Sequence, residues 1–243
     1  MSTMSTPHFN PQSQAYPRCH QGPPLLLMAL IYIALVIAGI VSGLMMAPPS
    51  AFPLPFEPVE KAVRYVAQYG GAIRWGSFFE FASAIPLGIF TATVVSLLRF
   101  HRVRAAGVWI AWFGGTSASI LLMVSALAGW ALSTPGIAQS AGGVRALQLL
   151  SFAAGGPGFA VPLGLLLAGV SIPSGFYRLL PKWLVWLGVV IAVAAELSTF
   201  TLLTWRAAMF IPVARFVSFV WLIGVAAKMP AIARGGSSAS VEG

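Results

Sequence analysis

The sequence predicts an all-α fold, a polytopic membrane bundle of six transmembrane helices with both termini in the cytoplasm. Of the 243 residues, 58% are hydrophobic and 8% are charged, whereas in soluble domains roughly a quarter of the residues are charged. Six apolar runs are each long enough to cross a bilayer, which takes about 20 residues. Each run is expected to be a helix, because lipid cannot hydrogen-bond free backbone groups.

The spans are expected at about 24–47, 73–98, 105–133, 144–170, 183–203 and 210–229, within one transmembrane domain, residues 24–230. Short connections rich in turn residues separate most of them. Residues 1–23 are rich in Pro, Ser, Gln and Thr, and residues 231–243 in Gly and Ser, so both are expected to be disordered cytoplasmic tails. A signal peptide is the alternative at the N-terminus, but the first apolar run is too long for one.

The connection at 48–72 is longer than the others and has its own pattern. Four prolines prevent a continuous helix at its start. Residues 57–69 then show helical spacing, with apolar side chains on one side and polar ones on the other. Glu57/Lys61 and Glu60/Arg64 are i,i+4 pairs with the acid first, the favourable order. We expect a short amphipathic helix on the membrane surface, with a plain spacer as the alternative.

The cations predict the orientation. The net charge is +9, from 14 Lys and Arg against 5 Asp and Glu. The two short loops carry five cations, Arg99, Arg102 and Arg104 in one and Arg178 and Lys182 in the other, and the positive-inside rule places these loops and both termini in the cytoplasm. Because the cations lie between apolar runs and not on one polar face, nucleic acid is not expected as a partner.

Three ionisable residues within the predicted spans form the candidate polar site: Glu80, Glu196 and Arg215. At 1.5 Å per residue, each lies about 8–10 Å inside the same outer boundary. An isolated charge costs about 2.5–3.5 kcal/mol at the centre of a span, so the three are expected to face each other or a wet cavity. In one interpretation the acids take up a proton or cation, with Arg215 as counter-ion. In the other, a Glu–Arg pair fixes the helix register.

The fourth run is interrupted by Gly155, Gly156, Pro157 and Gly158, with Pro162 one turn later. These residues remove backbone hydrogen bonds and side-chain bulk, which predicts a kink or break. A broken helix can line a substrate cavity. The alternative is a close helix crossing, the use that small residues usually serve in membranes.

Close packing is also the interpretation of Gly114-Gly115 and of the Gly39/Gly43 pair in the first span. In addition, Pro86-Leu87-Gly88 and Pro162-Leu163-Gly164 sit in similar surroundings, each followed by a basic loop and a tryptophan pair. Helices 2–3 would then be a parallel copy of helices 4–5, an arrangement known in transporters. Chance is the alternative, because these residue types are common in membrane helices.

Catalytic and metal-binding signatures are missing from the sequence. There is no H-E-x-x-H, G-x-S-x-G, P-loop or Rossmann motif, so no catalytic residue is assigned. His8, His20 and His101 lie outside the spans, and Cys19 is the lone cysteine. Neither a metal site nor a cofactor is therefore predicted.

Two motifs carry a resemblance to a known family: Leu180-Pro181-Lys182-Trp183-Leu184 with Trp186-Leu187-Gly188, and Pro212-Val213-Ala214-Arg215-Phe216 with Val220-Trp221-Leu222. They resemble a family of uncharacterised bacterial integral membrane proteins with six spans, a domain of unknown function. The resemblance covers about residues 25–230. It implies the cell inner (plasma) membrane of a bacterium and brings no substrate, cofactor or catalytic residue with it.

The sequence favours a structural, regulatory or partner-binding membrane protein, because catalytic motifs and large soluble portions are lacking. The expected partners are the lipid bilayer and either a second copy of the chain or another membrane protein. The alternative is a small proton- or cation-coupled transporter that uses Glu80, Glu196 and Arg215. A membrane-embedded enzyme with the two glutamates as acid and base is the weakest hypothesis.

Overall fold

The computed structural model describes residues 20–51 and 53–229, which are mostly helical and contain no strand. Six helical stretches of this described chain are long and apolar enough to cross a membrane: Leu25–Met46, Val59–Phe100, Gly107–Leu132, Ala141–Phe176, Lys182–Leu202 and Trp205–Lys228. The predicted all-α class and the six apolar helices are confirmed. The predicted tails lie outside the described residues, apart from residues 20–23.

Several of these stretches are built from more than one helical element. The α-helices are α1 Leu25–Met46, α2 Val59–Phe100, α3 Gly107–Leu132, α4 Ala141–Gly155, α5 Pro157–Phe176, α6 Lys182–Leu197, α7 Phe210–Pro212 and α8 Ser218–Lys228. The 3₁₀ segments are η1 Pro49–Ala51, η2 Ile137–Gln139, η3 Ser198–Leu202 and η4 Trp205–Met209, and η5 Val213–Val217 is π-helical.

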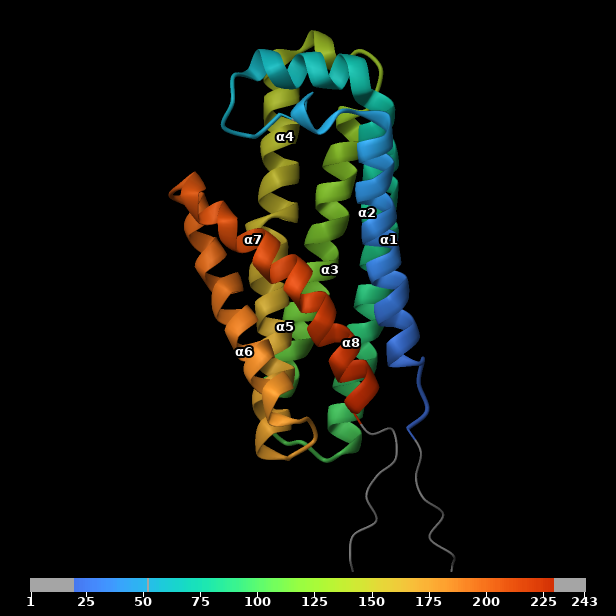
Figure 1. Cartoon of the computed structure of the whole chain (residues 1–243), viewed down its shortest axis with the longest axis vertical. Helices are drawn as coiled ribbons and strands as arrows, with labels where there is room; N and C mark the ends of the chain where they lie inside the picture. The colour runs from blue at the N-terminus through green and yellow to red at the C-terminus, as the bar shows by residue number, and fades with distance from the viewer. Residues whose placement is uncertain (1–19, 52, 230–243) are drawn as a thin grey trace, which may run out of the picture.

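The helices run along the long axis of the molecule between two chemically different ends (Figure 1). The proline end carries the α1–α2 connection and the α3–α4 turn. The arginine end carries the α2–α3 and α5–α6 turns, the start of α1 and the end of α8. The described cations at the arginine end are Arg99, Arg102, Arg104, Arg178, Lys182 and Lys228, and no described acid accompanies them.

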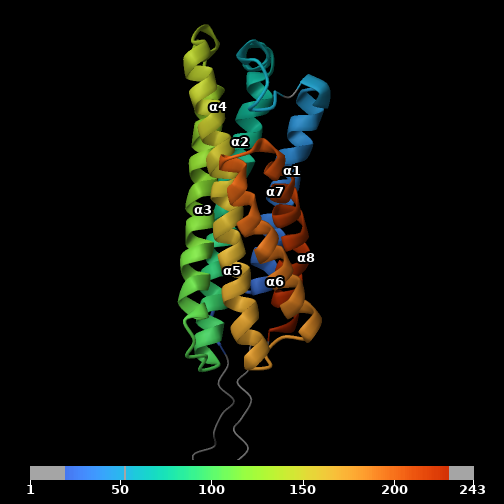
Figure 2. The ribbon, with the colours of Figure 1, turned by 90° about the vertical axis from the view of Figure 1, so that its left-hand side faces the viewer.

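The spans form a closed ring. α1 packs against α2, α2 against α3, α3 against α5 and α5 against α6, while α8 packs against both α6 and α1. Figure 2 shows α4 and α5 following one another along the long axis. The interior is apolar, with Leu87, Phe90, Leu163 and Trp221 almost inaccessible. Large apolar side chains also cover the outside, as expected where lipid is the solvent.

The predicted amphipathic helix and the second span form one element, α2, with a kink between them. Tyr69 has non-helical dihedral angles there, φ −120° and ψ 28°. The turns before Tyr69 lie across the proline end, and the rest of α2 descends through the bundle (Figure 1). Ala62 and Val66 of the transverse turns pack onto Leu132 of α3 and Val144 of α4, so this segment closes the end of the bundle.

The fourth span is broken at the glycines that the sequence singled out. α4 ends at Gly155, α5 begins at Pro157, and Gly156 between them has φ −90° and ψ −106°. A Cβ on Gly156 would lie 2.5 Å from the carbonyl oxygen of Phe152, so this geometry requires glycine. Pro157 is at the first helical position of α5, where a backbone N–H is not needed. Pro162 lies inside α5.

The last two spans are less regular than the predicted continuous helices. α6 ends at Leu197, and the chain then turns over through η3 and η4 before η5 leads into α8. Hydroxyl groups compete for backbone carbonyls on both sides of this turn: Ser198 Oγ donates to the Ala195 carbonyl and Ser218 Oγ to the Arg215 carbonyl. Such side-chain bonds offer the backbone alternatives to the α-helix. The tip of this hairpin stops short of the transverse part of α2 (Figure 1).

Small residues let α3 and α5 cross closely. A Cβ on Gly114 would lie 2.5 Å from the carbonyl oxygen of Pro162, and one on Gly169 would lie 2.6 Å from that of Gly107. In α1, Gly39 faces Phe79 closely, but a Cβ on Gly43 would have no atom within 4 Å. The close-packing interpretation of the Gly39/Gly43 pair therefore fails at Gly43, because α1 and α2 diverge there around a cavity.

The α2–α3 and α5–α6 turns share an uncommon backbone. Arg102 and Arg178 are the non-glycine residues with positive φ in the described chain, at 57° and 53°. In each turn the next residue bonds five positions back: Val103 N donates to the Leu98 carbonyl and Leu179 N to the Ser174 carbonyl. Both arginines lie at the same separation after the prolines of the similar Pro-Leu-Gly sequences. The likeness that suggested an internal repeat thus extends to local geometry.

We expect Gly114→Ala to lower the melting temperature of the detergent-solubilised protein. The new Cβ would press on backbone atoms of α5, and overpacking costs about 1–3 kcal/mol. The matched control is Gly142→Ala on the exposed side of α4, where a Cβ would meet nothing within 4 Å and alanine favours the helix. Equal melting temperatures for the two variants would contradict the described α3–α5 contact.

Candidate functional site

Two of the three predicted site residues meet inside the bundle. Glu80 lies on α2, and Arg215 lies on η5, the π-helical segment before α8. Arg215 Nη2 is 3.9 Å from Glu80 Oε1, and both side chains are about three-quarters buried, at 27% and 25% exposed for Glu80 and Arg215. The chain thus joins its second and sixth spans through an ion pair, an arrangement that lowers the cost of burying either charge.

Two serines extend this pair across the bundle. Ser125 Oγ of α3 lies within donating distance of two acceptors, Glu80 Oε1 at 3.2 Å and the Ser151 carbonyl at 3.0 Å, which share its single hydroxyl proton. Ser151 of α4 donates from Oγ to the Ser125 carbonyl at 3.2 Å. α2, α3 and α4 are therefore tied by polar contacts at the level where Arg215 approaches from the other side.

The broken fourth span supplies the remaining partner of Arg215. Arg215 Nη2 donates to the carbonyl oxygen of Gly155 at 2.8 Å, and its guanidinium carbon lies 4.7 Å from the ring centroid of Phe159. A cation at the last carbonyl of α4 is favoured by the helix dipole. Gly155 also makes room for the pair, because a Cβ there would overlap Ser125 Oγ and lie 3.2 Å from Glu80 Oε1.

Glu196, the third predicted site residue, does not join this cluster. It is exposed on α6, and no hydrogen bond or ion pair within the described chain links it to Glu80 or Arg215. The reason is rotation about the helix axis. Ala195 is buried against the bundle, and one residue turns a helix by about 100°, which directs Glu196 outward. Of the three predicted site residues, Glu80 and Arg215 are therefore brought together and Glu196 is not.

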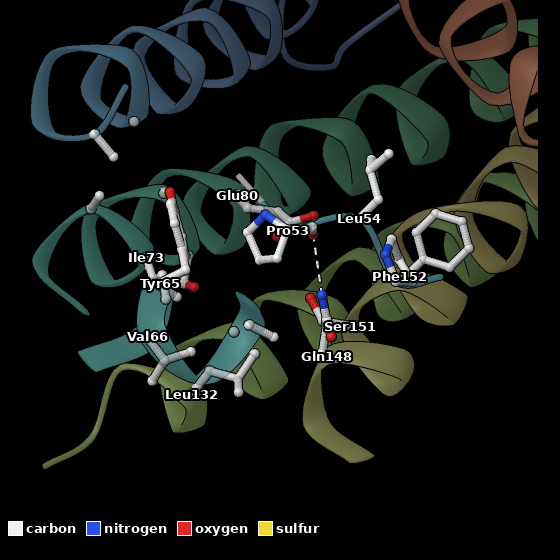
Figure 3. A pocket seen from close by; sticks show the side chains of 18 of the residues that line it. Pro53, Leu54, Tyr65, Val66, Ile73, Glu80, Leu132, Gln148, Ser151 and Phe152 are labelled. Carbon is white, nitrogen blue, oxygen red and sulfur yellow. Dashed lines mark hydrogen bonds between the residues drawn. The ribbon is translucent and has the colours of Figure 1, made fainter. Parts of the chain in front are cut away.

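A cavity of about 590 Å³ opens from Glu80 toward the proline end. Its walls are mainly apolar and come from α1, α2, α3, α4 and the α1–α2 connection. Figure 3 shows Tyr65, Val66 and Ile73 of α2 and Leu132 of α3 on one side of it, with Gln148, Ser151 and Phe152 of α4 on another. A volume of this size suits a small organic molecule, for which sites measure about 300–1,000 Å³.

The cavity has few polar groups, and Glu80 is the only Asp, Glu, Lys or Arg among its described lining residues. The carboxylate lines the cavity together with Ser77, Gln148 and Ser151, whereas Arg215 does not line it. Glu80 Oε1 is engaged by Ser125 and Arg215, and within the part of the chain that the structure describes no hydrogen bond reaches Oε2. The cavity therefore has a carboxyl group in its otherwise mainly apolar wall.

A proline-rich segment, residues 53–57, covers the cavity. Arg145 of α4 donates to the carbonyl oxygens of Pro55 and Glu57 at 2.6 and 2.5 Å, and Gln148 Nε2 donates to that of Pro53 at 3.1 Å (Figure 3). Phe56 packs edge-on against Phe152 at 5.6 Å between ring centroids. The cover is thus held by α4 through its backbone carbonyls.

Glu57 fixes the cover to the start of α2. Its carboxylate accepts hydrogen bonds from Lys61 Nζ and from the backbone N–H of Leu54, each at 2.7 Å. These two bonds, the one from Lys61 foremost, lower the pKa of the Glu57 carboxyl. A lowered pKa means that this attachment is complete above the ordinary glutamate value of about 4.3 and is lost only as the pH falls through the lowered pKa. Of the two predicted i,i+4 pairs, Glu57/Lys61 is formed in the structure.

Several site residues carry no signal in the sequence. Ser125 and Ser151 resemble the many serines that bond to their own helix, and only the tertiary arrangement directs them to Glu80. Arg145 lies near a loop, as several other cations do, and no feature of the sequence around it predicts a hydrogen bond to the Pro55 carbonyl.

In residues 20–51 and 53–229, no group of three His, Cys, Asp or Glu side chains is placed to hold a metal ion. In comparisons with known proteins, no family model, curated protein or solved structure matches this chain.

We expect Arg145→Ala to loosen the cover. It removes two charge-assisted hydrogen bonds to backbone carbonyls, and such bonds contribute about 1.5–3 kcal/mol each. Amide hydrogen exchange in residues 53–57 should then be faster by at least about tenfold, with α3 and α5 unchanged. Arg64→Ala, which removes an exposed arginine from the transverse part of α2, is the control. Unchanged exchange of the cover in Arg145→Ala would mean that other contacts hold it.

Proposed function

We propose that this chain is a multi-pass protein of a bacterial inner membrane that binds a small, mainly apolar molecule in the cavity beside Glu80. The observation that carries the proposal is a buried carboxylate, with a few other polar side chains, in the wall of an otherwise apolar cavity, the usual composition of a small-molecule site. Such binding suits a regulatory or partner-binding protein, because the molecule bridges several helices and would change how tightly they pack.

The chemistry of the cavity selects the ligand class. Glu80 Oε2 is a free acceptor, while the neighbouring cation, Arg215, is engaged by Gly155 and turned toward Phe159. A ligand with an ammonium or another N–H donor would donate a hydrogen bond to the Glu80 carboxylate. Its apolar body would contact the walls formed by α1 and α2. An anionic ligand would be repelled by the carboxylate and would find no Lys or Arg among the described lining residues.

We further propose that the arginine end faces the cytoplasm. The support is the cluster of six described cations at that end without an accompanying described acid, whereas Glu57 and Glu60 accompany the cations of the proline end. Both termini are then cytoplasmic, the transverse turns of α2 lie at the outer surface, and the cavity receives its ligand from the outside.

Transport of a proton or cation through the same site is the second candidate. It is favoured by the meeting of two irregular backbone segments at one ion pair, the break at Gly156 and the π-helical segment that carries Arg215. Discontinuous helices form the ion and substrate sites of many transporters, and π segments are frequent at functional sites.

The ligand-binding proposal is tested with 1-adamantylammonium, an apolar cation with N–H donors, added to the detergent-solubilised protein in equilibrium dialysis. We expect saturable binding that Glu80→Gln weakens by at least about tenfold, because the neutral amide loses a charge-assisted interaction. Glu60→Gln removes an exposed acid near the same end and should leave binding unchanged. 1-Adamantanecarboxylate, an anion of similar shape, should not compete.

The outcomes separate the three interpretations. Equal binding by wild type and a well-folded Glu80→Gln would refute the proposed ligand class. Failure of Glu80→Gln to fold, measured as loss of a monodisperse peak in detergent, would favour the purely structural ion pair. Proton or cation uptake into liposomes that Glu80→Gln abolishes and Glu196→Gln leaves intact would favour transport.

The orientation is tested by labelling single cysteines in intact cells. On a Cys19→Ser background, Arg206→Cys at the hairpin tip should react with a membrane-impermeant maleimide from outside. Arg102→Cys at the arginine end should react only after the cells are permeabilised. The opposite pattern would reverse the proposed orientation and place the cavity on the cytoplasmic side.

A further inference from the structure

A second hollow, a cleft of about 550 Å³, lies at the arginine end between α2 and α3. His20, Ser96, Arg99, Trp109 and Trp112 line it. It is remote from the Glu80 cavity, which opens toward the opposite end, and it shares no lining residue with that cavity. Its chemistry is also the reverse, because it contains cations and donors where the other contains a carboxylate.

The polar side of the cleft is rich in donors. Arg99 is exposed, and its guanidinium carbon lies 5.4 Å from the ring centroid of Trp109. His20 Nε2 is 3.0 Å from Ser96 Oγ, and the His20 ring packs edge-on against Phe100 at 5.6 Å. Guanidinium, imidazole and hydroxyl groups together match the oxygens of a phosphate group.

No negative charge balances this cluster in the described chain. Glu57 and Glu60 lie at the proline end, Glu80 is bound to Arg215, and Glu196 is on the exposed side of α6 near the hairpin turn. Arg99 forms no ion pair with any described residue. Arg102 and Arg104 follow in the same turn and add to the positive potential around the cleft.

The apolar side of the cleft continues along the bundle surface. Trp109 and Trp112 are 59% and 49% exposed, and tryptophans concentrate at the boundary between head groups and acyl chains. Ala92 and Val95 of α2 line the same cleft one to two turns toward the middle of the bundle. A ligand there would place a charged group at the end of the helices and an apolar chain along them.

We propose that this cleft binds an anionic phospholipid of the adjacent leaflet. The phosphate lies against Arg99, His20 and Ser96, and an acyl chain follows the groove between α2 and α3 past Trp112. A soluble anion would use only the polar half of the site. Basic pockets between transmembrane helices are known to hold anionic lipid head groups.

The test uses the protein reconstituted in liposomes that contain brominated phosphatidylglycerol or brominated phosphatidylcholine, whose bromine atoms quench tryptophan fluorescence. We expect phosphatidylglycerol to be preferred about fivefold, and Arg99→Gln to remove most of this preference. Arg99→Lys should retain it, because the charge remains. Arg64→Gln, an equal change of charge at the proline end, should leave it unchanged.

Two results would overturn the proposal. One is a preference for phosphatidylglycerol that is the same in Arg99→Gln, Arg64→Gln and wild type, since the effect would then be general surface attraction. The other is complete suppression of the preference by millimolar inorganic phosphate, which would identify the cleft as a site for a soluble anion. Ser96→Ala gives an independent check that leaves the charge and the Arg99–Trp109 contact in place, and it should weaken the preference.

Discussion

Lipid supplies no hydrogen bonds, so each polar group that leaves helical geometry inside this bundle needs a partner from the protein itself. Arg215 meets that requirement where it is most acute. Its guanidinium donates to the Gly155 carbonyl at the end of α4, lies against Phe159 of α5 and faces Glu80 of α2. One side chain thereby stabilises the break in the fourth span, the irregular start of the sixth and a buried carboxylate, and the ring of helices closes around it.

The cavity follows from side chains that are missing as much as from those that are present. Gly39, Gly43, Gly76 and Gly129 all line it, and a Cβ on Gly43 or Gly76 would meet no atom within 4 Å. Glycine in a membrane helix usually brings a neighbour closer. Here the segment at 53–57, held to α4 by Arg145 and Gln148, bridges the space that these glycines leave, so that α1 and α2 diverge without exposing their backbones.

Hydropathy and length were enough to predict the class and the spans, because burying apolar surface in lipid requires nothing of the neighbours. Contacts between spans depend on how each helix is rotated, which a single sequence does not reveal. Glu80 and Arg215 meet as expected, whereas Glu196, one residue from buried Ala195, faces outward. The role of Ser125 could not be predicted, because its contacts with Glu80 and Ser151 depend on the packing of α2 and α4 against α3. The sequence predicts two separate helices around Tyr69, whereas the structure has one helix, α2, with a kink at this residue. The kink lets the transverse turns bury their apolar side against Leu132 of α3, a contact that a single sequence does not reveal.

The matching turns at Arg102 and Arg178 have a consequence for ancestry. The offset that carries Pro86 to Pro162 and Arg102 to Arg178 also carries Glu80 to Gly156. If a two-helix unit was once copied, its two descendants differ beside Arg215, which contacts Glu80 in one and the Gly155 carbonyl, next to Gly156, in the other. One kept or acquired an acid, and the other lost its side chain and broke its helix. The pseudosymmetry would then remain in the turns at Arg102 and Arg178 and be lost around Arg215. Each copy would have taken a different role at the polar centre.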